Sequence, residues 1–197
     1  MRSTIRELFE TIILALVIFL GLQFSMGNYR VEGSSMSPTL KAGEYLLVNK
    51  LVYTRIEREN LPFADPDENT DAYQFERPKR GDVIIFEFPN NPERDFVKRV
   101  IGIPGDIVEI HEGQVWVNEI PLNEPYVTHR DSRYYYKKSI PVGFYYVLGD
   151  NRMSSNDSRD WGLVPVENII GKAWVRFWPL DRLESIKSQI TSAPSRN

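Results

Sequence analysis

Three segments of the sequence carry side chains that suit nucleophilic and proton-transfer chemistry. Residues 33–40 contain Ser35 beside a proline-containing turn, residues 95–101 contain Lys98, and residues 149–162 form a polar run in which Arg and Asp recur. A serine hydroxyl becomes a nucleophile when a base takes its proton, and a lysine amine is such a base once it is neutral. The segments therefore offer a hydroxyl and an amine for such chemistry, provided that the fold brings them together.

Each segment also has a plainer interpretation. A serine in a turn that precedes Pro38 is typical turn chemistry, and Lys98 fits an edge-strand lysine whose amine reaches solvent. Residues 149–162 fit a solvated loop, and a calcium loop is disfavoured because the spacing differs from an EF-hand and no Glu closes it. The recurring Arg and Asp favour a hydrogen-bond network that supports itself.

Of two neighbouring cations, Lys98 is the better candidate for a base. A period of two predicts one face with Phe96, Lys98 and Val100 and the other with Val97, Arg99 and Ile101. The period does not tell which face is buried. Arginine stays protonated in proteins, whereas a lysine among apolar neighbours loses its proton because burial disfavours the charged form.

The composition excludes several other kinds of site. The chain of 197 residues has no cysteine, which excludes disulfides, thiol nucleophiles, iron–sulfur clusters and Cys-type zinc sites. Its two histidines, His111 and His129, are expected at the surface, so we expect neither a metal nor a cofactor. The net charge of −3 argues against nucleic-acid binding. A hydrolase built from this chain therefore needs a hydroxyl nucleophile and an amine base.

An apolar segment precedes the candidate residues. Residues 8–26 are apolar apart from a few positions near the edges, and as a helix they rise about 28 Å, close to the thickness of a bilayer core. We expect a membrane anchor at 8–26 after a short flank at 1–7. A cleaved secretory signal is disfavoured because no small-x-small site follows, and a buried core helix is the third alternative. Arg2 and Arg6 at one end and Arg30 and Lys41 at the other leave the orientation undecided.

The rest of the chain predicts an all-β, mainly antiparallel domain over residues 27–182. Apolar residues with a period of two lie between turn residues, and helical periodicity is almost lacking. We expect strands at 45–48, 82–88, 96–103, 107–110, 114–117, 145–148 and 173–178, with a hairpin turn at Glu112-Gly113. Residues 54–80, acidic over 64–76, are expected to form a solvated loop, and residues 183–197 a polar, flexible tail.

Four motifs in this order, after an N-terminal span, resemble the type I signal peptidases of the peptidase S26 family. The motifs are residues 35–40 (SMSPTL), 80–86 (RGDVIIF), 98–106 (KRVIGIPGD) and 149–162 (GDNRMSSNDSRDWG). Each motif alone is weak, and their order makes the resemblance specific from the anchor to about Trp178. The resemblance implies a signal peptidase/LexA-like β-fold and a membrane-anchored serine protease with a Ser–Lys dyad.

The resemblance also implies roles for individual residues. Ser35 matches the family's nucleophile and Lys98 its general base. Ser155 matches the hydroxyl that orients the lysine amine, and Asp157 and Arg159 match the ion pair that holds the last loop beside the dyad. The short distance in sequence between Lys98 and Gly149 resembles the family members that lack a large inserted β-domain.

Oxyanion and substrate contacts follow from the same resemblance. Gly33 stands where some members carry an oxyanion-binding Ser, so the backbone N–H of Ser35 is one expected donor and a second donor is not assigned. The implied substrates are secretory preproteins with small residues at −1 and −3. The positions that match the substrate pockets are Tyr29, Val31, Met36, Leu40, Phe96 and Val97.

The implied location is a plasma membrane of a bacterium, or an organellar membrane of bacterial descent. The expected arrangement is a single pass through the lipid bilayer with the catalytic domain on the extracytoplasmic side, and nucleic acid is not an expected partner. Two alternatives remain open. One is a self-cleaving Ser–Lys protease of the LexA type, which the N-terminal span disfavours; the other is a non-enzymatic, membrane-tethered β-domain that binds a partner through residues 64–76.

Overall fold

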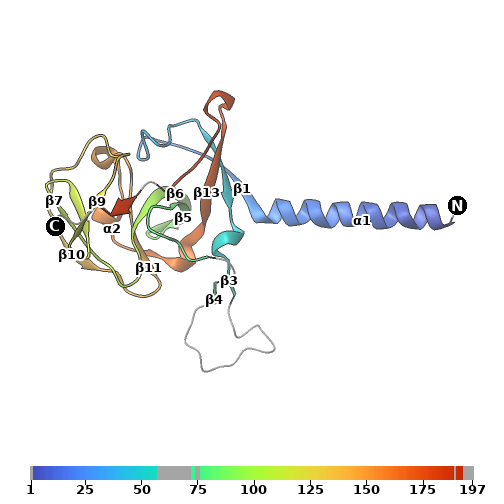
Figure 1. Ribbon diagram of the computed structural model, residues 1–197, viewed down its shortest axis with the longest axis horizontal. Coiled ribbons are helices and arrows are strands. Elements are labelled where there is room, and N and C mark those ends of the chain that lie inside the picture. Colours follow the sequence, from blue (N-terminus) through green and yellow to red (C-terminus); the bar gives the residue numbers. More distant parts are fainter. Residues whose placement is uncertain (1, 57–71, 74–75, 189, 193–197) are drawn as a thin grey trace, which may run out of the picture.

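The fold consists of one long helix and a β-domain (Figure 1). The structure, a computed structural model, describes residues 2–56, 72–73, 76–188 and 190–192. Most of the acidic loop expected at 64–76 lies outside the described residues. The all-β class is confirmed, because the domain is built mainly of antiparallel strands.

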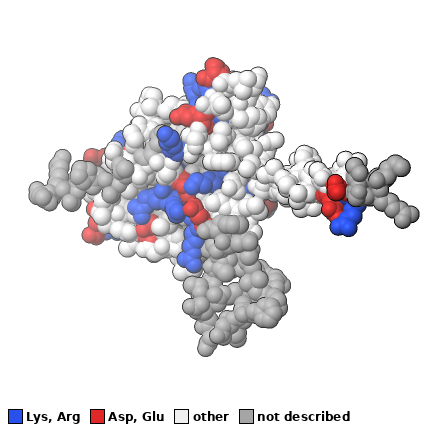
Figure 2. Space-filling view, turned by 45° about the vertical axis from the view of Figure 1, so that its right-hand side comes forward, with Lys and Arg blue, Asp and Glu red and all other residues white. Residues whose placement is uncertain are grey.

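The helix α1 runs from Arg2 to Ser25 and projects away from the β-domain (Figure 1). Its segment Arg6–Ser25 is long and apolar enough to cross a membrane, and none of that segment is buried against the protein. Figure 2 shows an uncharged stretch of helix between the domain and the charged residues near the far end, where Arg6 pairs with Glu10. The helix begins earlier than the predicted anchor because residues 2–7 continue the same helical turns.

The larger sheet has strands of unequal length and carries Lys98. Its strand order is β1-β2-β13-β5-β6-β11-β12, and β14 pairs with β13. The strands are β1 (Met26–Arg30), β2 (Tyr45–Asn49), β5 (Val83–Phe88), β6 (Asn91–Gly102), β11 (Phe144–Leu148), β12 (Val164–Pro165), β13 (Ile169–Trp178) and β14 (Glu184–Ser185). All pairings in this sheet are antiparallel.

A smaller sheet lies at the end of the domain remote from α1 (Figure 1). Its order is β10-β7-β8-β9-β15. Its strands are β7 (Ile107–His111), β8 (Gln114–Val117), β9 (Ile120–Asn123), β10 (Tyr135–Ser139) and β15 (Thr191–Ser192). Short elements complete the described fold: β3 (Arg55–Ile56), β4 (Ala72–Tyr73), α2 (Ser158–Trp161) and the 3-10 turns η1 (Leu51–Tyr53), η3 (Arg152–Ser154), η4 (Val166–Asn168) and η5 (Leu180–Arg182).

Apolar side chains from both sheets form three buried clusters. One cluster lies against the small sheet around Ile110 and Leu148. A second packs around Met36, Leu40 and Leu46, and a third packs around Phe86. Burial alternates along β2, β7 and β8, whereas consecutive residues of β5, β6 and β11 are buried, so these central strands pack against clusters on both faces of the sheet. The second and third clusters fix the segments on which the candidate residues stand.

Several elements differ from the sequence-based expectation for identifiable reasons. The strand β1 follows α1 without a turn residue, so no break in the sequence marks it. The strand β10 consists largely of exposed polar residues, and the turn between β8 and β9 places Asn118 and Glu119 at positive φ without a glycine. By contrast, the hairpin expected at Glu112-Gly113 joins β7 to β8, with both turn residues at positive φ.

Part of the segment expected as a flexible tail at 183–197 is ordered against the domain. Residues 184–185 form β14 on β13, and residues 191–192 form β15 on β9. Ile190 packs on the cluster of the small sheet, and the Ser188 hydroxyl donates to the carbonyl of Arg80 at 3.1 Å. Two-residue pairings of this kind leave no periodicity in a sequence, so a polar composition alone suggested a tail.

Candidate active site

Ser35 lies in the loop between β1 and β2, and apolar anchors hold that loop. Met36 and Leu40 are buried in the core around Leu46, and the Leu40 N–H donates to the Met36 carbonyl at 2.8 Å. The Ser37 N–H donates to the carbonyl of Ser34 at 3.0 Å, which closes a turn around Ser35. Packing in the core therefore fixes the position of Met36, while Ser35 itself is half-buried at the surface of a cleft.

Lys98 stands on β6, opposite Ile84 of the neighbouring β5. Its side chain is only 4% exposed. The Nζ atom lies 2.9 Å from the Oγ atom of Ser35 and 3.0 Å from the carbonyl oxygen of Val97. The ring of Phe96 lies 5.1 Å from the same nitrogen. The fold thus brings the predicted nucleophile and the predicted base within hydrogen-bond distance.

Burial changes the acidity of this lysine. Loss of solvent lowers the pKa of Lys98 from 10.5 to about 8, and the negative charges of Asp157 and Asp150 act in the opposite direction. With that pKa, about a tenth of the amine is neutral at pH 7 and about half at pH 8. Lys98 is therefore able to accept a proton in the physiological range, which an exposed lysine is not.

A short backbone junction at residues 149–151 locks the serine loop in place. The Asn151 N–H donates to the carbonyl of Ser35 at 2.9 Å, and the Asn151 amide donates to the carbonyl of Ser34 at 3.2 Å. Gly149 allows this approach: a Cβ atom there would lie 2.5 Å from the Ser35 carbonyl oxygen and 2.2 Å from the Oγ atom of Ser155. The junction therefore requires glycine at this position.

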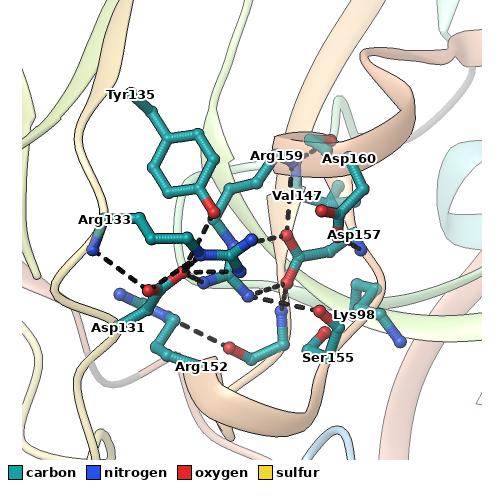
Figure 3. Close-up of polar contacts among 12 residues, drawn as sticks. Lys98, Asp131, Arg133, Tyr135, Val147, Arg152, Ser155, Asp157, Arg159 and Asp160 are labelled. Atoms are coloured by element: carbon teal, nitrogen blue, oxygen red, sulfur yellow. Dashed lines mark hydrogen bonds and ion pairs between the residues drawn. The ribbon is translucent and has the colours of Figure 1, made fainter.

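The first residue of the junction is held by a buried ion pair. The carboxylate of Asp157 accepts the Gly149 N–H at 2.9 Å and is fully buried. The Arg159 guanidinium donates to both oxygens of Asp157, at 2.8 and 2.9 Å, and reaches Asp131 at 2.9 Å (Figure 3). Asp157 also caps α2 in a capping box with Asp160. The predicted Asp157–Arg159 pair thus supports the loop that contacts the serine.

The hydroxyl of Ser155 is placed near the dyad without a partner of its own. Its Oγ atom is buried and has no hydrogen-bond partner among the described residues. A Cβ atom at Gly149 would lie 2.2 Å from this Oγ atom and 2.5 Å from the Ser35 carbonyl oxygen, so the hydroxyl lies beside the serine loop. A buried hydroxyl normally has a hydrogen-bond partner, and no described group supplies one to Ser155. Its predicted orienting role stays a prediction.

A second ion pair holds the next residue of the junction. The Arg99 guanidinium grips the Asp150 carboxylate with two hydrogen bonds of 2.9 and 2.7 Å, and both side chains are completely buried. The Thr39 hydroxyl donates to the same carboxylate at 2.5 Å. Asp150 therefore ties the serine loop to β6. Sequence reasoning placed Asp150 and Arg99 in motifs but gave them no role, since a long-range ion pair has no signal in one sequence.

A cleft of about 670 Å³ opens over the dyad. Four of the six residues predicted for the substrate pockets line it, together with Gly33, Ser35 and Lys98: Tyr29, Val31, Phe96 and Val97. Met36 and Leu40 instead lie in the core and are not among the lining residues. Burial raises the pKa of Tyr29, and the carboxylates of Asp95 and Glu87 add to that effect.

Among the described residues, no group of three or more His, Asp or Glu side chains is placed so that it could hold a metal ion. His111 pairs with Glu109 at 3.1 Å on the small sheet, and His129 is exposed. The arrangement at the cleft suits proton transfer from a serine to an amine.

Comparison with known proteins identifies the family. The sequence profile described as "Signal peptidase, peptidase S26" matches residues 5–178. The signal peptidase I of Leptolyngbya laminosa is 36% identical over 189 residues, which cover 92% of this chain and 83% of the relative. The signal peptidase IB of Staphylococcus aureus (strain Mu50 / ATCC 700699) is 34% identical, covering 91% of this chain and 94% of the relative.

A solved structure also aligns with part of the chain. A crystal structure of a signal peptidase I from Enterococcus faecalis V583 covers 49% of this chain and 97% of the solved chain, at 30% identity and a TM-score of 0.45. The family profile spans most of the sequence, from α1 to the end of β13. The chain therefore belongs to the signal peptidase family, peptidase S26.

Proposed function

We propose that Ser35 and Lys98 form the catalytic dyad with which this serine endopeptidase removes signal peptides from preproteins. The observation that carries the proposal is the 2.9 Å distance between the Lys98 Nζ and Ser35 Oγ atoms at the base of the cleft. The names of the relatives support the activity, since they are signal peptidases I.

The proposed reaction begins with proton transfer. Neutral Lys98 takes the proton of the Ser35 hydroxyl while the oxygen attacks the scissile carbonyl, and the ammonium then gives a proton to the leaving amine. Water next attacks the acyl-enzyme while Lys98 takes its proton, and the ammonium returns that proton to the Ser35 oxygen as the ester bond breaks and the carboxylic acid product leaves. The lowered pKa of Lys98 supports this role, because with a pKa of about 8 about a tenth of the amine is neutral at pH 7, far more than for an exposed lysine.

The oxyanion of the tetrahedral intermediate needs donors at the serine loop. The backbone N–H of Ser35 is the proposed donor, and Gly33 lies in the same cleft without a side chain to contribute a second one. One donor of this kind is worth about 3–4 kcal/mol of transition-state stabilisation. The core contacts of Met36 fix the orientation of this backbone.

The substrate is proposed to bind as an extended strand against β6. In the described sheet, β6 pairs with β11 from Arg99 onward, so residues 94–97 carry no strand on that edge. An extended chain there would gain main-chain hydrogen bonds, and side-chain pockets would supply selectivity. Val31, Phe96 and Val97 line the cleft beside Ser35, and these bulky walls favour small residues at −1 and −3.

We propose that the anchor holds the site close to a membrane. The helix α1 ends at Ser25, β1 follows directly, and Tyr29 of β1 already lines the cleft. Family membership and the apolar helix indicate membrane anchoring. We propose a single pass with the catalytic domain on the extracytoplasmic side, where preproteins emerge.

Cleavage in trans separates this proposal from the LexA-type alternative. The full chain in detergent is mixed with a preprotein that has Ala at −1 and −3, and with a matched preprotein that has Leu at −1. A signal peptidase cleaves the first and spares the second. Cleavage confined to the chain itself would favour the self-cleaving alternative.

A further inference from the structure

Arg152 and Arg99 both bind the junction at residues 149–151. Both arginines also contact one segment next to the small sheet, residues 124–126. The Arg152 Nε donates to the carbonyl of Gly149 at 3.0 Å, and its Nη atoms donate to both oxygens of Glu124. The ring of Tyr126 lies 4.1 Å from the guanidinium carbon of Arg99. Gly149 is thus linked to the 124–126 segment through Arg152, and Asp150 is linked to the same segment through Arg99.

This arrangement is buried and well paired. Glu124, Tyr126 and Arg152 are each less than 5% exposed. The Tyr126 hydroxyl donates to the Glu124 carboxylate at 2.8 Å, which leaves that carboxylate no freedom to turn away from Arg152. A bidentate Arg–carboxylate pair fixes orientation as well as distance.

Both backbone polar groups of Gly149 are consequently hydrogen-bonded to buried side chains. The Gly149 N–H donates to the Asp157 carboxylate at 2.9 Å, and the Gly149 carbonyl accepts a hydrogen bond from the Arg152 Nε atom. The Cα atom between these groups faces the Ser35 carbonyl and the Ser155 hydroxyl so closely that a Cβ atom would overlap with both. A shift of this peptide therefore moves the backbone that carries the nucleophile.

We propose that Glu124 and Tyr126 are positioning residues for the Ser35–Lys98 dyad, acting through Arg152 and Arg99 on the junction at 149–151. The proposal rests on the proposed function and deepens it. The 124–126 segment lies outside the four motifs that suggested the family, and it follows β9 of the small sheet. The small sheet thus supports the geometry of a dyad that belongs to the large sheet.

The test compares kcat and KM of the full chain with those of its Glu124→Gln variant, both in detergent and at a temperature at which both are folded. A misplacement of about 1 Å can lower a rate about 100-fold, so kcat for a preprotein should fall on that scale. KM should change little, because the cleft residues Tyr29, Val31 and Val97 are untouched. Glu119→Gln, an exposed carboxylate five residues away, is the matched control and should keep both constants.

A double variant separates positioning from stability. Glu124→Gln combined with Arg152→Met removes both buried charges, so the unfolding temperature should recover relative to the single variant. Under the proposal kcat stays low, because the Gly149 carbonyl has lost its donor. Recovery of kcat together with the unfolding temperature, or a wild-type kcat in folded Glu124→Gln, would overturn the proposal.

Two controls keep the outcome independent of the proposed function. Failure of the wild type to exceed Ser35→Ala on the preprotein would count against the function itself. The rate at which a reactive acyl ester labels Ser35, followed by mass spectrometry, needs no preprotein. Labelling slowed in Glu124→Gln and in the double variant supports the positioning role, and labelling at the wild-type rate in both contradicts it.

Discussion

The Lys98 Nζ atom lies 2.9 Å from the Ser35 Oγ atom, although 63 positions separate the two residues. The serine stands on a loop fixed by core side chains, and the lysine stands on β6 in the middle of the large sheet. The junction at residues 149–151 joins them, since Asn151 holds the Ser35 carbonyl and Asp150 is gripped by Arg99. The dyad geometry is thus a product of three separate parts of the fold.

The rate of cleavage should depend on the protonation of Lys98. Because burial lowers its pKa to about 8, kcat/KM should rise with pH and level off above that value. Below it, the rate should fall about tenfold per pH unit, because only the neutral amine accepts the serine proton. A pH series of preprotein cleavage between pH 6 and 9.5 measures this limb. A flat profile down to pH 6 would exclude Lys98 as the base.

The catalytic lysine should destabilise the fold at neutral pH. Its folded-state pKa lies below the usual 10.5, so below pH 8 the folded protein carries a buried charge that the unfolded chain keeps in water. Lys98→Met should therefore raise the free energy of unfolding by about 3 kcal/mol at pH 7. The gain should shrink between pH 8 and 10.5, as the unfolded lysine also loses its proton. Denaturant unfolding at pH 7 and 9.5 tests the trend, and a gain independent of pH would contradict it.

Removal of the Asp157 charge should shift the pH profile to lower pH. The negative charge of Asp157 raises the pKa of Lys98 against the effect of burial, so Asp157→Asn should move the rising limb below pH 8. The free energy of unfolding should fall by about 3 kcal/mol, because Arg159 loses a buried partner. Asp160→Asn, an exposed neighbour in the same capping box, is the control. Asp160→Asn should lose about 1 kcal/mol of stability, and its rate should rise over the same pH range as the wild-type rate. An equal shift of the pH profile in both variants would contradict this explanation.

Gly149→Ala should separate the junction from the serine loop. The new Cβ atom would lie 2.5 Å from the Ser35 carbonyl oxygen, and a backbone oxygen cannot turn away as the Ser155 hydroxyl can. We expect kcat to fall about 100-fold. The control is Gly105→Ala, where φ is +90° and no heavy atom lies within 4 Å. That variant should lose about 1 kcal/mol of stability and keep its activity, so equal losses of activity would refute the steric explanation.

Much of the fold follows from local patterns in the sequence. Short apolar or alternating segments between turn residues predicted β5, β7, β8 and β11 to within a residue or two at each end, and the Glu112-Gly113 turn predicted the hairpin of β7 and β8. The apolar run predicted the position of α1, whose start differs by a few residues. These features depend on neighbouring residues, which one sequence displays directly.

The support of the site depends on contacts that a sequence does not display. Arg99 and Asp150 are 51 positions apart, and Arg152 and Glu124 are 28 apart. Nothing in the neighbouring residues distinguishes these buried charges from exposed ones, so the sequence predicted no role for Glu124. Met36 and Leu40 show a related difficulty, because an apolar residue near a nucleophile suits a pocket wall and a core equally well. The structure places both in the core.

The assignment of Ser35 as the nucleophile is best examined by comparing cleavage of a preprotein with Ala at −1 and −3 by the full chain and by its Ser35→Ala variant. Removal of one hydroxyl changes little else, since Ser35 is half-buried on a loop whose core contacts belong to Met36 and Leu40. We expect the wild type to release the signal peptide and Ser35→Ala to show only background cleavage while unfolding at the wild-type temperature. Cleavage by Ser35→Ala at the wild-type rate would contradict the assignment of Ser35 as the nucleophile.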